Sequence, residues 1–175
     1  LGDVYKRQTY VRARAADGRV YILAEALVPS VLGEGAEILS RFEGRALVGL
    51  SYVPLFDLPV DFGQQQGYRV VSDGYVTLTD GTGIVHIAPA FGEDDAEIGR
   101  RYNLPFVKLV DDRGRLTENC GRYAGVFCKD ADKLIIEDMK ADGRLVKEMM
   151  CEPSYPFCWR CDTPFLYNAR SSWFI

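Results

Sequence analysis

The residues with the clearest capacity for chemistry lie in the stretch GTGIVHIAPAFGEDD, residues 81–95. Its apolar spacing predicts a helix over residues 92–102, with Asp95 at the head of an otherwise apolar face. Free N–H groups and the helix dipole favour a negative charge there, so the Asp95 carboxylate is expected to stay ionised while it faces a pocket. His86, the only histidine of the chain, lies on a strand predicted for residues 84–88. A carboxylate and an imidazole at these places could bind a ligand or take part in catalysis.

Both side chains also have an ordinary structural interpretation. An acidic residue in the first turn of a helix is usually a cap. A lone histidine among apolar residues is more often a packed core group than a catalyst. The residue types alone therefore leave both interpretations open for Asp95 and His86.

The order of residues in GTGIVHIAPAFGEDD resembles the editing-site motif of isoleucyl-tRNA synthetases, which lies in their inserted editing domain, called CP1. These enzymes are among the large class I synthetases for branched aliphatic amino acids. The valyl relatives are similar through GTG and the following AP, but they usually carry lysine at the position of His86. The leucyl relatives carry methionine near that position. His86 followed by AFGEDD therefore favours the isoleucyl type.

This resemblance implies hydrolysis of tRNA(Ile) that carries valine by mistake, with release of valyl-adenylate as a second activity. Burial of the one methylene that distinguishes isoleucine is worth only about 1–3 kcal/mol, and isoleucyl-tRNA synthetase is itself the standard example of this shortfall. A second site must therefore remove the smaller product. The resemblance implies that Asp95 binds the α-ammonium group and that His86 blocks the extra methyl group of isoleucine.

The remaining residues of the predicted site surround this pair. The glycines of Gly81-Thr82-Gly83 would let the backbone approach the terminal adenosine closely. Phe91 would complete the wall beside His86, and Tyr155 would border the pocket, with a packing role as an equal alternative. The predicted substrate-binding residues are Gly81, Thr82, Gly83, Ile84, Ala88, Phe91 and Tyr155. Because no residues have the spacing of a triad, a positioned water is expected to attack the ester.

Size and composition fit one medium domain, or one domain with an appendage. The 175 residues are 47% hydrophobic and 12% aromatic, and no apolar run approaches the roughly 18 residues that a membrane span needs. The net charge of -4 argues against binding long nucleic acids by charge alone, but it allows a pocket for one terminal nucleotide. The expected partners are the 3′ end of tRNA(Ile) and the catalytic domain of the same full-length chain, with no membrane.

The chain has five cysteines, an odd number, which favours a reducing compartment and hence a cytoplasmic location. Cys158 and Cys161, in CWRC, have the spacing of half a tetrahedral zinc site. In the resembled family the partner cysteines lie before this segment and some members lack the metal, so zinc is expected only together with residues outside this chain. ATP is expected only for the full-length enzyme. The other thiols, Cys120, Cys128 and Cys151, are interpreted as small apolar residues.

Periodicity predicts the elements that position these groups. A hairpin is predicted at 9–14 and 19–26, helical turns at 27–32 and 36–42, strands at 46–56, 68–72, 75–78 and 106–110, and a second helix at 130–142. Short strands with few helices and no βαβ alternation predict a β-rich α+β fold, a closed or nearly closed β-barrel decorated with short helices. Residues 1–8 are predicted to be a non-native leader, 9–150 the editing domain, and 151–175 a descending limb that returns to the catalytic domain.

Three alternative functions remain open. The first is a valyl-type editing domain that clears Thr-tRNA(Val). The second is a folded fragment that binds but does not hydrolyse, because the threonine-rich segment that lines the pocket in the family is missing from this sequence. The third is a small zinc protein in which the CWRC pair matters most.

Overall fold

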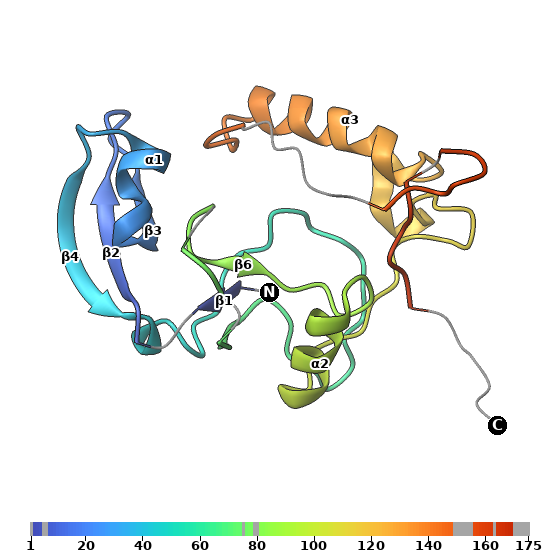
Figure 1. The fold of residues 1–175 in the computed structure, drawn as a ribbon, viewed down its shortest axis with the longest axis horizontal. Coiled ribbons are helices and arrows are strands. Elements are labelled where there is room, and N and C mark those ends of the chain that lie inside the picture. The colour runs from blue at the N-terminus through green and yellow to red at the C-terminus, as the bar shows by residue number, and fades with distance from the viewer. Residues whose placement is uncertain are drawn as a thin grey trace.

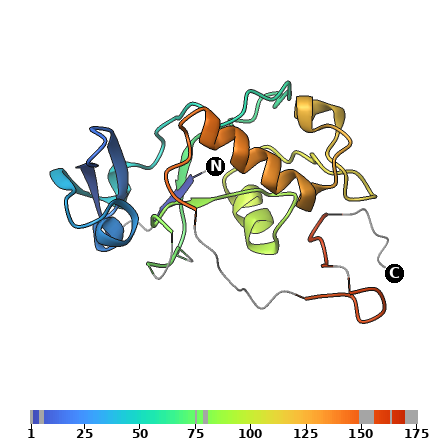
Figure 2. The same cartoon turned by 90° about the horizontal axis from the view of Figure 1, so that it is seen from above.

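A computed structural model describes residues 2–4, 7–74, 76–78, 81–148, 156–162 and 164–169, the first of these ranges by its backbone. Within these ranges the chain is strand-rich α+β, as predicted. Figure 1 shows one antiparallel sheet at the left, helix α2 at the lower centre and helix α3 at the upper right. Seen from above, α3 lies between that sheet and the segment 156–169 (Figure 2). No helix in the described part of the chain is long and apolar enough to cross a membrane.

The predicted hairpin is confirmed as strands β2 (Thr9–Arg14) and β3 (Val20–Ala24). With β4 (Glu37–Glu43) they form an antiparallel sheet in the order β3-β2-β4. Val11 and Leu23 are buried in a cluster with Val28 of helix α1 (Val28–Leu32), so α1 covers one face of this sheet. The 3-10 helix η1 (Glu25–Leu27) leads into α1, which confirms the predicted turn at 27–32.

The predicted helical turn at residues 36–42 is wrong, because this stretch forms strand β4. Ile38 and Phe42 are four residues apart, a spacing typical of a helix, but β2 has a second edge whose N–H and C=O groups need partners. Pairing with that edge decides the conformation. Arg14 of β2 also contacts Glu37 of β4 at 2.8 Å.

The strand predicted for residues 46–56 is not part of a sheet. The 3-10 helix η2 (Gly44–Ala46) is followed by an extended chain whose sheet pairing is one isolated bridge, Ser51 to Arg69. From 52 to 62 the side chains alternate strictly between half-buried and exposed, with Val53 92% exposed. We name residues 52–62 the extended segment; its even-numbered residues face inward.

The second sheet contains β1 (Gly2–Val4), β5 (Val70–Ser72) and β6 (Val85–His86) in the order β5-β1-β6. β1 runs parallel to β5 and antiparallel to β6. Residues 2–4 thus pair within a sheet although they fall in the predicted leader, and the non-native origin of that leader stays a prediction. Residues 76–78 and 106–109 are not strands, and Tyr75 lies outside the described residues.

Both predicted helices are confirmed, as α2 (Glu93–Arg101) and α3 (Cys128–Ala141). The 3-10 helix η3 (Glu118–Tyr123) precedes α3. Ile98 of α2 is 2% exposed and packs with Val71 and Ile87, so α2 is fixed to strand β5 and to the chain that follows β6. A Cβ added to Gly99 would lie 2.8 Å from Pro89, which shows how closely α2 approaches the turn at 88–91.

The two sheets meet at the GTG sequence, but no strand ladder of the described residues joins them into the predicted barrel. The Tyr10 hydroxyl donates to the carbonyl of Gly83 at 2.6 Å, and Ala24 N–H donates to the carbonyl of Thr82 at 2.8 Å. A Cβ on Gly83 would lie 2.5 Å from Ala24 Cβ. Gly83 therefore permits the close approach of the two sheets.

We predict that Gly83→Ala lowers the free energy of unfolding by about 1–3 kcal/mol more than Gly81→Ala does. Both glycines have positive φ, +72° and +69°, so both substitutions carry the same kind of backbone strain. Gly81 has nothing within 4 Å of an added Cβ, whereas Gly83 meets Ala24. Urea unfolding measures the difference, and equal losses would contradict the packing role of Gly83.

Candidate functional site

A cavity of about 460 Å³ opens between the extended segment, residues 86–91 and residues 105–109. Its volume is in the range of small-molecule sites. Most of its lining side chains are apolar or aromatic, and none of them carries a permanent charge. The polar side chains in the lining are His86, Tyr52 and Tyr68. The cavity therefore suits a ligand portion that is largely uncharged.

His86 ends strand β6 and lines this cavity. The residue is exposed as a whole, but partial burial of its side chain desolvates the imidazole. This desolvation lowers the pKa of His86 below 6.5, and the nearby Asp95 carboxylate opposes the shift without reversing it. The imidazole is therefore neutral at pH 7, so it can form a rigid wall without repelling an ammonium group.

Asp95 lies in the first turn of α2 and is half-buried. One of its carboxylate oxygens accepts a hydrogen bond from Ala88 N–H at 3.0 Å. No side chain caps the N-terminus of α2, where Gly92 is the N-cap residue. The carboxylate thus joins the helix to Ala88, which lines the cavity, whereas Asp95 itself is not one of the lining residues.

The other predicted site residues fall into two groups. Ala88 and Phe91 line the cavity with His86. Gly83 is buried, and Ile84 packs against the core cluster at the sheet junction. Gly81 and Thr82 lie at the same junction, where the Thr82 hydroxyl donates to the carbonyl of Ile84 at 3.3 Å. Tyr155 lies outside the described residues.

The inward row of the extended segment forms much of the cavity wall and was missed by the sequence analysis. Its residues are Tyr52, Pro54, Phe56, Leu58, Val60 and Phe62. Apolar side chains at every second position were the signal. That signal was masked because the outward row also carries apolar residues, among them Val53 and Leu55.

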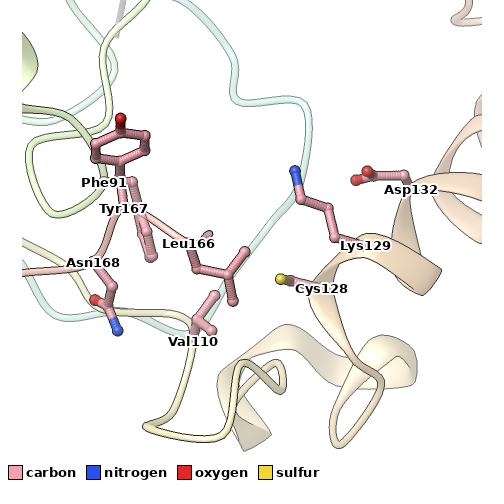
Figure 3. Close-up of a pocket in the computed structure, with 8 residues that line it drawn as sticks. All are labelled: Phe91, Val110, Cys128, Lys129, Asp132, Leu166, Tyr167 and Asn168. Atoms are coloured by element: carbon pink, nitrogen blue, oxygen red, sulfur yellow. The ribbon is translucent and has the colours of Figure 1, made fainter. Parts of the chain in front are cut away.

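A smaller cavity of about 150 Å³ lies behind Phe91, between α3 and the chain at 166–168. Figure 3 shows Phe91, Leu166 and Tyr167 on one side and Cys128 and Lys129 of α3 on the other. Burial raises the pKa of the Cys128 thiol, so this thiol stays protonated at neutral pH and is a poor nucleophile. Close by, Ala169 N–H donates to the carbonyl of Ala90 at 3.0 Å, which attaches the chain after 164 to the 88–91 turn.

The CWRC pair lies on a turn in which Asp162 N–H donates to the carbonyl of Cys158 at 2.9 Å. Cys158 is half-buried and Cys161 is exposed. Across the described ranges no group of three or more histidine, cysteine, aspartate or glutamate side chains could hold a metal. The residues described here therefore do not complete a zinc site, and zinc stays a prediction. Cys120 is buried, as expected for a small apolar residue, and Cys151 lies outside the described residues.

Comparison with solved structures first defines the class of fold. No family model matches the chain. Its structure is similar to the crystal structure of GlLeuRS-CP1, with a TM-score of 0.61, 14% identity, and coverage of 85% of this chain and 78% of that one. The chain thus has the fold of a CP1 domain.

Sequence comparison then identifies the family. The chain is 48% identical over 95% of its length to the isoleucine–tRNA ligase of Methanothermobacter thermautotrophicus. It is 44% identical to that of Clostridium novyi and 43% identical to that of Thermus thermophilus, each over 98% of its length. The chain belongs to the isoleucine–tRNA ligase family, and it spans about 16% of the length of these three relatives.

We predict that His86 titrates below pH 6.5 in the folded protein, and that Asp95→Asn lowers its pKa further, because the substitution removes a charge that favours the imidazolium. Since His86 is the only histidine, one set of NMR imidazole signals reports its pKa. Asp94→Asn, on the exposed side of the same helix turn, is the control and should leave the pKa unchanged.

The lowered pKa of His86 also makes the free energy of unfolding depend on pH. The unfolded chain binds this proton more tightly than the folded chain, so the free energy of unfolding falls as the pH drops from 6.5 towards the lower folded-state value. His86→Gln removes this contribution. A pKa above 6.5, or one that rises in Asp95→Asn, would contradict the described environment.

Proposed function

We propose that this chain is the editing domain of an isoleucine–tRNA ligase and hydrolyses the ester of Val-tRNA(Ile), with valyl-adenylate as a second substrate. One observation carries the proposal: His86 lines an apolar cavity of about 460 Å³, and the Asp95 carboxylate accepts a hydrogen bond from the N–H of Ala88, which lines the same cavity. The family membership supports it, because a ligase for isoleucine must reject valine, which is smaller by one methylene.

Asp95, His86 and Phe91 would orient the substrate. A carboxylate has about four lone-pair sites, so Asp95 can bind an α-ammonium group while it keeps the hydrogen bond from Ala88 N–H. This contact gains strength where the cavity excludes water. The valine side chain would then lie against His86 and Phe91, both of which line the cavity.

Hydrolysis would proceed by attack of a positioned water on the acyl carbon. The ester bond to the ribose breaks, the ribose oxygen takes up a proton, and valine and free tRNA leave. A neighbouring ribose hydroxyl can assist this proton transfer. No described side chain is placed as a nucleophile in the cavity: the Cys128 thiol lines the other cavity and is held protonated by burial.

The activity is proposed for the whole ligase, since the chain spans only about 16% of the length of relatives such as that of Thermus thermophilus. The 3′ end of tRNA(Ile) and the catalytic domain of the same polypeptide are the proposed partners. A cytoplasmic location is proposed, as the Arabidopsis thaliana relative is named a cytoplasmic isoleucine–tRNA ligase. A valyl-type function would instead favour Thr-tRNA(Val), and comparison of the two charged tRNAs distinguishes them.

We predict that Asp95→Ala, in the ligase that carries this segment, slows deacylation of Val-tRNA(Ile) by roughly 10- to 150-fold. This range corresponds to loss of a charge-assisted hydrogen bond of about 1.5–3 kcal/mol. Release of labelled valine from the charged tRNA measures the rate. Asp94→Ala is the matched control, because Asp94 is exposed on the same helix turn.

Asp95→Asn separates the two roles of the carboxylate. Its amide oxygen can still accept the hydrogen bond from Ala88 N–H, but it carries no charge for the ammonium group. A loss of rate in both Asp95 variants supports the anchor role. Unchanged hydrolysis in Asp95→Ala would rule that role out.

We predict that His86→Ala allows the same enzyme to hydrolyse correctly charged Ile-tRNA(Ile), because the imidazole then no longer fills the space beside the cavity wall. Deacylation of Ile-tRNA(Ile) should rise from near background, while hydrolysis of Val-tRNA(Ile) continues. His86→Phe, which keeps a ring, should retain the discrimination. If Ile-tRNA(Ile) stays intact in His86→Ala, another part of the cavity measures side-chain length.

A further inference from the structure

The smaller cavity, of about 150 Å³, combines apolar side chains with two opposite charges. Val110 and Leu166 supply the apolar part together with Phe91, whereas Lys129 and Asp132 come from the N-terminal part of α3. The three apolar residues are half-buried and the two charged residues are exposed, so the charges lie nearer to solvent. A cavity built in this way suits a small ligand that has charged groups at one end and hydrocarbon at the other.

Both charges lie close to the Cys128 thiol, which lines the same cavity. Figure 3 shows the sulfur of Cys128 pointing from α3 towards Leu166. Burial raises the pKa of this thiol, Lys129 lowers it and Asp132 raises it, so both charges act on the same small space. Residues three apart on a helix have neighbouring side chains. Lys129 and Asp132 can therefore contact two groups of one small molecule.

Hydrogen bonds and packing join the parts of the chain that enclose this cavity. Cys128 N–H donates to the carbonyl of Gly114 at 2.9 Å, which attaches the start of α3 to the turn that ends at this glycine. A Cβ added to Gly114 would lie 2.8 Å from the Leu166 side chain, so the late segment packs against the same turn. Ala169 N–H donates to the carbonyl of Ala90 on the other side. The cavity is thus enclosed by segments that are fixed to one another.

We propose that the smaller cavity binds a free α-amino acid with a short apolar side chain, such as valine. Its carboxylate would contact Lys129, its ammonium group would contact Asp132, and its side chain would lie against Val110 and Leu166. The choice of valine as the natural ligand rests on the proposed editing function, which releases valine. The chemical class of the ligand rests on the cavity alone.

The pair of opposite charges favours a zwitterion. A phosphate, or any other anion without a positive group, would be attracted by Lys129 and repelled by Asp132. The volume restricts the side chain, since an engineered cavity of about 150 Å³ in another protein holds a molecule of the size of benzene. The side chain of valine fits into such a space, whereas the indole of tryptophan exceeds it.

Phe91 lines both cavities and therefore separates the proposed amino-acid site from the larger cavity. His86 belongs to the lining of the larger cavity, whereas Cys128 and Lys129 belong to that of the smaller one. Substitutions can thus be directed at either cavity by itself. They distinguish valine in the smaller cavity from valine that enters the larger one.

Titration of valine against the 175-residue chain, followed by NMR, tests the proposal. The expected Kd is millimolar, because the ligand has few atoms and its charges stay partly in water. Lys129→Gln and Asp132→Asn should each weaken binding by about two- to fivefold, the equivalent of about 0.4–1 kcal/mol for one exposed charged contact. Lys133→Gln and Asp130→Asn, at exposed residues of α3 outside the lining, are the matched controls.

Two substitutions of Cys128 test the space itself. Cys128→Leu places a larger side chain in the cavity and should abolish valine binding. Cys128→Ser is nearly equal in size and should keep the Kd within about twofold. Circular dichroism of both variants confirms folding. Isovalerate, which lacks the ammonium group, and isobutylamine, which lacks the carboxylate, should each bind more weakly than valine.

Asp95→Ala separates this proposal from the editing function, because Asp95 is not part of the smaller cavity's lining. Valine binding that depends on Lys129 and Cys128 should persist in Asp95→Ala. Binding that is lost in Asp95→Ala but kept in Lys129→Gln and Cys128→Leu would place valine in the larger cavity and overturn the proposal, while it leaves the editing function intact.

Binding that is absent in the original chain, or equal in all variants, would also overturn the amino-acid site. Binding that depends on Lys129 and Cys128, together with no deacylation by the whole ligase, would support the amino-acid site and remove the proposed function.

Discussion

The attachment of helix α2 to the turn at 88–91 is the constraint on which the site depends. It has three parts: Asp95 accepts the hydrogen bond from Ala88 N–H, Gly99 allows contact with Pro89, and Ile98 packs beside Ile87. Helix α2 is thus attached at one joint, the contact between α2 and residues 87–89, by a hydrogen bond, a close backbone approach and apolar burial. Because side chains of this turn line the cavity, the joint sets the shape of the pocket as well as the stability of the fold.

The Asp95 carboxylate supports the 88–91 turn and, in the proposed function, also binds an ammonium group. If Asp95 only supported the turn, an uncharged acceptor of the same shape would serve equally well. A negative charge at the N-terminus of a helix is favoured by the helix dipole, and Asp95 lies in the first turn of α2. In the proposed function the same carboxylate supports the cavity wall through Ala88 N–H and binds the ammonium group of the substrate.

Local sequence patterns were sufficient to predict the elements that are stabilised by local interactions. Helix α2 and the β2–β3 hairpin were predicted from periodicity, whereas the joint role of Asp95 and His86 came from the resemblance to the isoleucyl editing motif. Strand β4 was mistaken for a helical turn because its conformation is decided by the distant edge of β2. The extended segment was not recognised as a cavity wall because its outward row begins with the apolar residues Val53 and Leu55 and turns acidic only at Asp57 and Asp61. Gly83 was assigned to ligand approach because its contact with Ala24 joins residues far apart in the sequence.

The hydrogen bond from Ala169 to the carbonyl of Ala90 attaches the segment at 164–169 to the same turn that Asp95 supports. A displacement of this late segment would therefore be transmitted to the pocket by one bond, without passing through either sheet. Leu166 of the same segment lies beside Gly114 and lines the smaller cavity with Cys128 of α3. The segment at 164–169 is therefore a mechanical connection between α3 and the turn that shapes the larger cavity.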